Sequence, residues 1–177
     1  KMKKQLLIIP SIIFFLILFV FFYLLTIERD PSKIPSNLLN KNFPNFESES
    51  LLKENKFIAL EEFKNEKILV NFFASWCKPC RDEHDYILQF SKVENLKVIG
   101  INYKDNSEKA ISWLNKLGNP YSKIAIDKNG AIAINWGVYG IPETFIINSK
   151  GTVKYRHVGP VTKKIYKEIN SLIKEIK

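Results

Sequence analysis

The sequence predicts an α/β fold with a central mixed sheet flanked by helices, preceded by one N-terminal transmembrane helix. Residues 6–27 form a run of 22 residues without a charged side chain. The remainder alternates between short apolar runs typical of buried strands and segments with apolar residues at helical spacing. We therefore expect an N-terminal signal anchor in residues 1–27, a linker leading into extended chain in residues 28–50, and the α/β domain in residues 51–177.

The apolar run is long enough to cross a membrane. As a helix, its 22 residues would be about 33 Å long, which spans a hydrocarbon core of roughly 30 Å. A cleaved signal peptide is the alternative, but its apolar region is usually shorter and ends at a small-residue cleavage site, which this sequence lacks. Lys1, Lys3 and Lys4 precede the run, so the positive-inside rule predicts a cytoplasmic N-terminus and a domain outside the cytoplasm.

The net charge of +9 does not indicate a nucleic-acid-binding protein. Such proteins concentrate basic residues on one face or loop. Here arginine occurs only at Arg29, Arg81 and Arg156, and the lysines are scattered along the chain. We therefore expect a solvated, lysine-rich surface and no nucleic-acid partner.

Strands and helices alternate along the expected domain. Alternation of this kind predicts parallel strands joined by helical crossovers, and a C-terminal hairpin adds antiparallel strands. Ser107 is the expected N-cap of one helix, and Gly118 lies just past its end. The expected elements are a strand at 67–74, a helix from about 77 to 90, a strand at 96–103, a helix at 107–117, a strand at 123–127, a turn at 128–130, a hairpin at 144–147 and 153–157, and a helix at 162–176.

The stretch SWCKPC, residues 75–80, holds the only two cysteines of the chain. A disulfide that closes so short a loop would stabilise the fold little, so a purely structural disulfide is disfavoured. Cys77 is expected at a helix N-terminus beside Lys78, where the dipole and the ammonium favour the reactive thiolate. Cys80, one turn later, is expected to be less exposed and to resolve a mixed disulfide.

A metal site is the alternative use of the same cysteines. His84 is expected on the same helix, and with Cys77 and Cys80 it could bind copper. An exposed helical histidine is the commoner explanation, and a Trp-Cys-x-x-Cys motif between a strand and a helix favours redox chemistry. Trp76 is expected either to shield the cysteines or to belong to the core.

A second notable stretch is GVYGIPETF, residues 137–145. Pro142 is either a cis proline in a tight turn or a trans proline that opens a strand. If Pro142 is cis, the backbone of Ile141 would be free to pair with an extended peptide beside Cys77.

The strand–WCxxC–helix unit with a later proline before a hairpin resembles the thioredoxin fold. More narrowly, the chain resembles the CcmG/DsbE family of membrane-anchored periplasmic thiol:disulfide interchange proteins of cytochrome c maturation. The resemblance covers most of the chain after the apolar run. It is carried by IPSNLLNKNFPNF (34–46), LVNFFASWCKPCRDEH (69–84), VIGINYKDN (98–106), KAISWLNKLGNPY (109–121), GVYGIPETFII (137–147) and YRHVGPV (155–161).

The resemblance implies a role for each residue of these motifs. Cys77 would attack and Cys80 would resolve, and Pro142 would be cis. Thioredoxins commonly carry a buried acid six residues before the first cysteine, but Asn71 stands there, so Glu143 is expected to take over as the base that tunes the cysteines. The polar Asn71 then needs hydrogen-bond partners inside an apolar strand. Active-site support is expected from Trp76, Lys78, Pro79, Asn71 and Glu143, and substrate binding from Tyr139, Ile141 and Pro142.

The resemblance also implies a function. The protein would act as a monomeric periplasmic reductant that keeps the haem-binding cysteines of apocytochrome c reduced, directly or through a companion thiol protein. A membrane electron donor of the DsbD/CcdA type would recharge it, and no cofactor is expected beyond the redox-active disulfide. The CxxC motif leaves the direction open, because potentials in this fold run from about −270 to −120 mV. The alternatives are a reductase for another client, such as a copper-centre assembly protein, and a copper metallochaperone.

Overall fold

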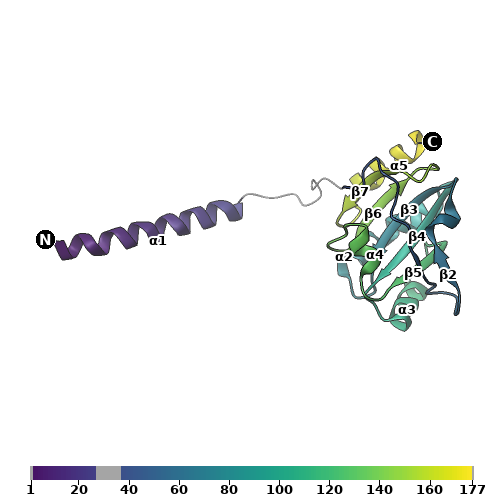
Figure 1. Cartoon of the computed structure of the whole chain (residues 1–177), viewed down its shortest axis with the longest axis horizontal. Helices are drawn as coiled ribbons and strands as arrows, with labels where there is room; N and C mark the ends of the chain where they lie inside the picture. Colours follow the sequence, from purple (N-terminus) through teal and green to yellow (C-terminus); the bar gives the residue numbers. More distant parts are fainter. Residues whose placement is uncertain (1, 27–36, 177) are drawn as a thin grey trace. The chain divides into compact units, whose positions relative to one another are not determined.

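The structure is a computed structural model of the whole chain that describes residues 2–26 and 37–176 (Figure 1). The chain divides into two units. The first contains helix α1 (Met2–Thr26), in which residues 8–26 have a mean hydropathy of 2.9 and are apolar and long enough to span a membrane. The predicted apolar helix is therefore present up to Thr26 as a candidate membrane span, and Ile27 lies outside the described residues.

The second unit is built on a five-stranded mixed sheet with the order β5-β4-β3-β6-β7. The pairs β3/β4 and β4/β5 are parallel, whereas β3/β6 and β6/β7 are antiparallel, as the sequence predicts. The strands are β3 (Lys67–Phe73), β4 (Leu96–Tyr103), β5 (Lys123–Asp127), β6 (Glu143–Ile147) and β7 (Val153–Val158). These bounds agree with the expected strands to within one residue.

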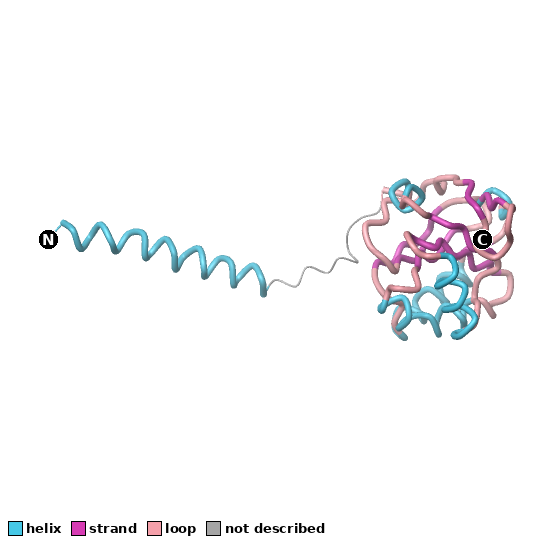
Figure 2. Tube along the Cα trace, turned by 90° about the horizontal axis from the view of Figure 1, so that it is seen from below, coloured by secondary structure: helices cyan, strands magenta, loops and turns pink. Residues whose placement is uncertain are grey.

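Helices cover both faces of this sheet. Leu69 and Phe73 of β3 point to the face covered by α2 (Lys78–Phe90), α3 (Ser107–Leu117) and α5 (Lys163–Glu175). Val70 and Phe72 point to the other face, where the short helix α4 (Ala131–Asn135) and the 3₁₀ helix η2 (Leu60–Phe63) pack. Figure 2 shows the longer helices gathered on one side of the strands. Because both faces are covered, the central strands are mostly apolar.

The domain begins earlier than the expected boundary at residue 51. An antiparallel pair of short strands, β1 (Glu47–Glu49) and β2 (Phe57–Ala59), lies beside β5, where Leu51 N–H donates to Ile124 O at 2.9 Å. Upstream, Asn40 N–H donates to Val153 O at 2.8 Å. The sequence did not indicate β1, because three residues with two glutamates give no apolar alternation.

The N-cap of α3 differs from the sequence expectation. Asn106, not Ser107, caps α3, because its side chain accepts from Lys109 N–H at 3.0 Å. Gly118 ends the helix as predicted, with a φ of +94° that favours glycine. Helix α4 was not predicted, since its five residues are too few to show a helical period.

Candidate functional site

The two cysteines lie where β3 passes into α2, and they form a disulfide. The S–S distance is 2.04 Å. Cys77 is the N-cap of α2, and its sulfur accepts a hydrogen bond from Cys80 N–H at 3.1 Å. The backbone of the first helical turn therefore points at the Cys77 sulfur and favours its thiolate after reduction. Both cysteines are buried, at 4% and 2% exposure, so the predicted difference in exposure is too small to distinguish them.

The residues around the cysteines lie on the surface. Trp76 is 59% exposed, so the alternative that it is a core residue is wrong. Its indole N–H donates to Lys104 O at 3.1 Å. Lys78 and Pro79 are exposed in the first turn of α2. A proline is well tolerated there because backbone nitrogens in the first turn have no intrahelical hydrogen-bond acceptor.

The loop before β6 faces the disulfide. The Ile141–Pro142 bond is cis, and the carbonyl oxygen of Ile141 lies 3.8 Å from the sulfur of Cys77. Among the described hydrogen bonds, none uses the N–H of Ile141. The backbone at Ile141 is therefore placed for pairing with an extended peptide that approaches Cys77.

Glu83 is the buried acid on the cysteine side of the sheet, and the sequence analysis missed it. Its carboxylate accepts from Asn71 Nδ2 and from Val161 N–H, both at 2.8 Å. Asn71 also donates to Thr144 Oγ1 at 3.2 Å and accepts from the Tyr121 hydroxyl at 2.8 Å. The prediction that Asn71 needs hydrogen-bond partners is thus confirmed. Asn71 thus links β3 to Glu83 of α2.

Glu83 shares the inward face of α2 with Cys80. Residues three apart on a helix lie on the same side, so the carboxyl group follows Cys80 by one turn. Burial raises the pKa of Glu83 to about 8, against the lowering effect of its hydrogen bonds to Val161 and Asn71. The spacing Cys80, Glu83, Ile87 and Phe90 is the signal in the sequence that could have placed this glutamate on the buried stripe.

Glu143 lies on the opposite face of the sheet. Its neighbour Thr144 pairs with Asn71 and points to the cysteine side, and successive strand residues alternate. The Glu143 carboxylate accepts from Arg156 Nε at 2.8 Å and from Tyr139 N–H at 3.3 Å. Glu83, and not Glu143 as expected, is therefore the buried acid on the cysteine side of the sheet. An indirect influence of Glu143 on the cysteines stays a prediction.

Arg156 and Glu143 brace the loop that carries Ile141. The Arg156 side chain also donates to Gly137 O at 2.9 Å, and its guanidinium carbon lies 5.3 Å from the ring centre of the exposed Tyr139. Burial raises the pKa of Glu143, and the hydrogen bond and charge of Arg156 limit that rise. The side chains of Glu143 and Arg156 are 0% and 6% exposed, so water cannot solvate either charge if its partner is removed.

Replacing Arg156 with methionine is expected to destabilise the fold by about 3–5 kcal/mol at neutral pH. The change leaves the buried Glu143 carboxylate without its partner. Chemical denaturation followed by tryptophan fluorescence measures the loss. Adding Glu143→Gln should recover part of it, because the double variant has no uncompensated charge. A single variant as stable as the wild type would contradict the assignment of this ion pair.

His84 is buried, so the expectation of an exposed histidine is wrong. The side chain is 2% exposed, with Nε2 2.9 Å from Gly118 O and its ring against Trp113. Burial lowers the pKa of His84 and favours the neutral ring. Within residues 2–26 and 37–176, no group of three His, Cys, Asp or Glu side chains is arranged to hold a metal ion.

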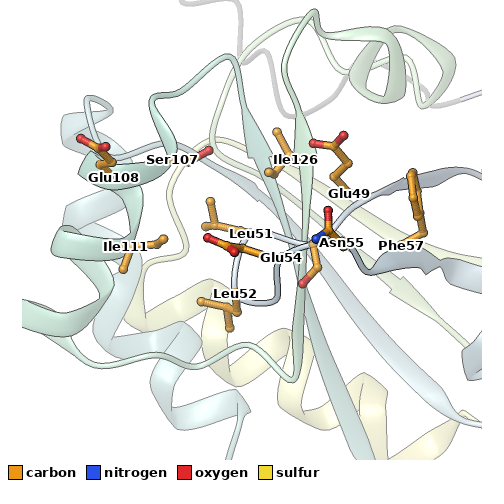
Figure 3. A pocket seen from close by; sticks show the side chains of 11 residues that line it. Glu49, Leu51, Leu52, Glu54, Asn55, Phe57, Ser107, Glu108, Ile111 and Ile126 are labelled. Carbon is orange, nitrogen blue, oxygen red and sulfur yellow. The ribbon is translucent and has the colours of Figure 1, made fainter.

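Two hollows of about 580 Å³ each flank α3. One lies between the β1–β2 strands and α3, and its walls carry the carboxylates of Glu49, Glu54 and Glu108 (Figure 3). Neither cysteine lines it. The other is lined by Ser75 and Trp76, which directly precede Cys77, and by residues of α2 and α3, and neither cysteine lines it.

Comparison with known proteins agrees with this geometry. The Redoxin family matches residues 38–173. The thiol:disulfide interchange protein DsbE of Vibrio cholerae is 42% identical over 170 residues, which cover 94% of this chain and 92% of the relative. DsbE of Escherichia coli is 40% identical over 171 residues, with the same two coverages. A DsbF homologue from Corynebacterium diphtheriae superposes with a TM-score of 0.70 at 18% identity, over 84% of this chain and 97% of its own, and supports the fold alone.

These relatives settle the family, because the identity extends over nearly the whole chain. They also confirm the thioredoxin-like fold and the exchange chemistry expected of two cysteines in CxxC spacing. The chain belongs to the CcmG/DsbE family of thiol:disulfide interchange proteins, and it is a thioredoxin-like thiol:disulfide oxidoreductase.

Proposed function

We propose that this protein is a membrane-anchored periplasmic reductant of the haem-binding cysteines of apocytochrome c. The observation that carries the proposal is the Cys77–Cys80 disulfide facing the Ile141–Pro142 backbone in a chain of the DsbE family. An extended client segment pairs with the free Ile141 N–H and brings its own disulfide to Cys77. Helix α1 anchors the domain in the inner membrane, with the N-terminal lysines on the cytoplasmic side.

The exchange proceeds in two steps. In the reduced protein, the Cys77 thiolate attacks one sulfur of the client disulfide, and the other client sulfur leaves as a thiolate. The Cys80 thiolate then attacks Cys77, the mixed disulfide breaks, and the second client sulfur leaves. Two electrons pass to the client, its two sulfurs take up two protons, and Cys77–Cys80 becomes the disulfide seen in the structure.

Glu83 accepts the proton of Cys80 in one step and returns it in the other. Cys80 must lose a proton before it attacks and regain one when a donor reduces the disulfide. A carboxyl group with a pKa of about 8 exchanges protons in the working range, whereas an ordinary glutamate would stay ionised. Asn71 and the Val161 N–H hold this carboxyl group in place.

A reductant in the periplasm needs an electron donor. The periplasm is kept oxidising, so a reduced cysteine pair persists there only if electrons are delivered across the membrane. A membrane electron donor of the DsbD/CcdA type supplies them. A companion thiol protein of cytochrome c maturation is the alternative direct client of Cys77.

A deletion strain tests this function. Loss of the gene should lower mature c-type cytochrome, measured by haem staining, and the wild-type chain should restore it while Cys77→Ser should not. An added small-molecule thiol should also restore it, because the missing activity is reduction. Normal cytochrome levels in the deletion strain would sink the proposal.

A further inference from the structure

The turn after β4 holds the residues that precede the nucleophile. This turn carries Asp105, in the motif INYKDN, and leads from Tyr103 into the first residue of α3. Lys104 has a left-handed φ of +44° at the turn, and its N–H donates to Asp127 O at 2.9 Å. The turn is thereby fixed to the neighbouring strand β5.

The carboxylate of Asp105 gathers four hydrogen bonds. Oδ2 accepts from Ser75 N–H at 2.5 Å and from Asn102 Nδ2 at 3.0 Å. Oδ1 accepts from the Ser75 hydroxyl and from Asn106 N–H, both at 2.8 Å. Four donors converging on two oxygens suit a carboxylate, because a carboxamide offers only one acceptor atom.

Two of these bonds reach the stretch SWCKPC from 30 residues away. Ser75 gives both its N–H and its hydroxyl to Asp105, and the next residue, Trp76, gives its indole N–H to Lys104 O. Cys77 follows directly, with its N–H bound to Ala74 O at 3.2 Å. Both residues between Ala74 and the nucleophile are thus tied to one turn.

The same turn shapes the surface next to the disulfide. Ser75 and Trp76, which directly precede Cys77, form one wall of a hollow, and α3, which begins directly after Asp105 and Asn106, supplies another wall. Within the described part of the chain, Asp105 forms no ion pair within 4 Å. The hydrogen bonds from Ser75, Asn102 and Asn106 are therefore the interactions that stabilise its carboxylate.

We infer that Asp105 is a positioning residue for thiol–disulfide exchange. It binds Ser75 directly, and it fixes the turn whose Lys104 carbonyl binds Trp76. In this way it holds the Cys77 sulfur toward Ile141 and keeps the exposed indole in one orientation for the incoming partner. The inference rests on the exchange activity of the family and not on the cytochrome client proposed above.

Asp105→Ala is expected to lower the exchange rate about 10- to 100-fold, mainly in the maximal rate, because the nucleophile is misplaced by a fraction of an ångström or more. The assay follows exchange between the prereduced full-length protein in detergent and an uncharged peptide disulfide at increasing peptide concentration. Asp105→Asn should fall between Ala and the wild type, since it keeps one acceptor. Ser75→Ala should lose less than Asp105→Ala, because the Ser75 N–H bond remains.

Acrylamide quenching reports the position of Trp76 independently of the rate. Trp76 is 59% exposed, whereas Trp113 and Trp136 are 6% and 1% exposed, so quenching reports mainly Trp76. Asp105→Ala should increase quenching, because the turn that carries the Lys104 acceptor of the indole is no longer bound to Ser75. Asp82→Asn is the matched control, since it removes an exposed carboxylate on α2 and should change neither readout.

The inference is overturned if Asp105→Asn and Ser75→Ala exchange at the wild-type rate with wild-type quenching. It is also overturned if Asp105 variants lose activity only in proportion to their unfolded fraction. Should Asp105→Ala fail to fold, the exchange rates and quenching of Asp105→Asn and Ser75→Ala still test the inference. Because the peptide is uncharged and unrelated to cytochromes, failure of the cytochrome proposal leaves this test intact.

Discussion

Cys77→Ser is expected to remove all exchange above the uncatalysed background. Cys77 is the cysteine whose sulfur caps α2 and lies 3.8 Å from the Ile141 carbonyl oxygen, where a client segment can pair. A serine hydroxyl at this position is almost entirely protonated at neutral pH and cannot form a mixed disulfide. Turnover of a peptide disulfide with a thiol donor measures the loss.

Cys80→Ala is the matched variant, and its expected result is different. Cys77 can still attack, but nothing resolves the product, so one client should stay bound to each protein molecule. Non-reducing electrophoresis and mass spectrometry of such complexes from cells would identify the clients. Trapped apocytochrome c or a companion thiol protein would support the proposed function, and a copper-centre assembly protein would redirect it. Equal trapping by Cys77→Ser would contradict the assignment of the attacking cysteine.

Glu83→Gln is expected to flatten the pH dependence of the two steps in which Cys80 exchanges a proton. With a pKa of about 8, Glu83 becomes a base as pH rises through 8 and remains an acid below it. The step in which Cys80 attacks Cys77 should therefore accelerate with pH through this range. The step in which Cys80 leaves, when a donor reduces the disulfide, should slow over the same range. General acid–base catalysis typically contributes about 10²- to 10⁴-fold, so the effect should be large.

Single-turnover kinetics of each half-reaction between pH 6 and pH 9 measure these slopes. In Glu83→Gln both profiles should be flatter and both rates lower. Asp82→Asn again serves as the control, because its carboxylate is exposed on the same helix. Identical pH profiles in the wild type and Glu83→Gln would remove Glu83 from the proton-transfer step.

The same residue should give the oxidised protein a pH-dependent stability. The folded protein keeps the Glu83 proton up to about pH 8, whereas the unfolded chain loses it near the ordinary value of 4.5. Between these values the folded state binds more protons, so its unfolding free energy falls as pH rises, by up to about 1.4 kcal/mol per pH unit. Glu83→Gln should abolish this contribution in denaturation measured at pH 5, 6.5 and 8.

The sequence by itself determined the features that depend on local patterns. An uncharged run of 22 residues predicts a helix long and apolar enough to span a membrane, because hydropathy and length are properties of a continuous segment. Periodicity located the five strands of the sheet and helices α2, α3 and α5. The spacing of Cys77 and Cys80 before a helix indicated redox chemistry, because a helix N-terminus stabilises a thiolate regardless of the rest of the fold.

Only the tertiary structure decided which acid lies on the cysteine side of the sheet. Strand β6 pairs with β3 so that Thr144 faces the cysteine side and Glu143 faces away, and a shift of one residue would reverse this. The network around Glu83 joins Asn71 to Thr144, 73 residues apart, and Glu83 to Val161, 78 residues apart. Local sequence patterns carry no information about such pairings, because they depend on how the strands align and how α2 docks on the sheet.

The stretch that holds the cysteines shows both contributions. Its two thiols and its position between strand and helix can be inferred from six residues of sequence. That Ser75 and Trp76 are held by the turn at Asp105, and that Cys77 faces Ile141, required the fold, because these partners come from separate parts of the sheet. Secondary structure follows from short-range periodicity, whereas an active site is assembled from side chains that meet only after the sheet has formed.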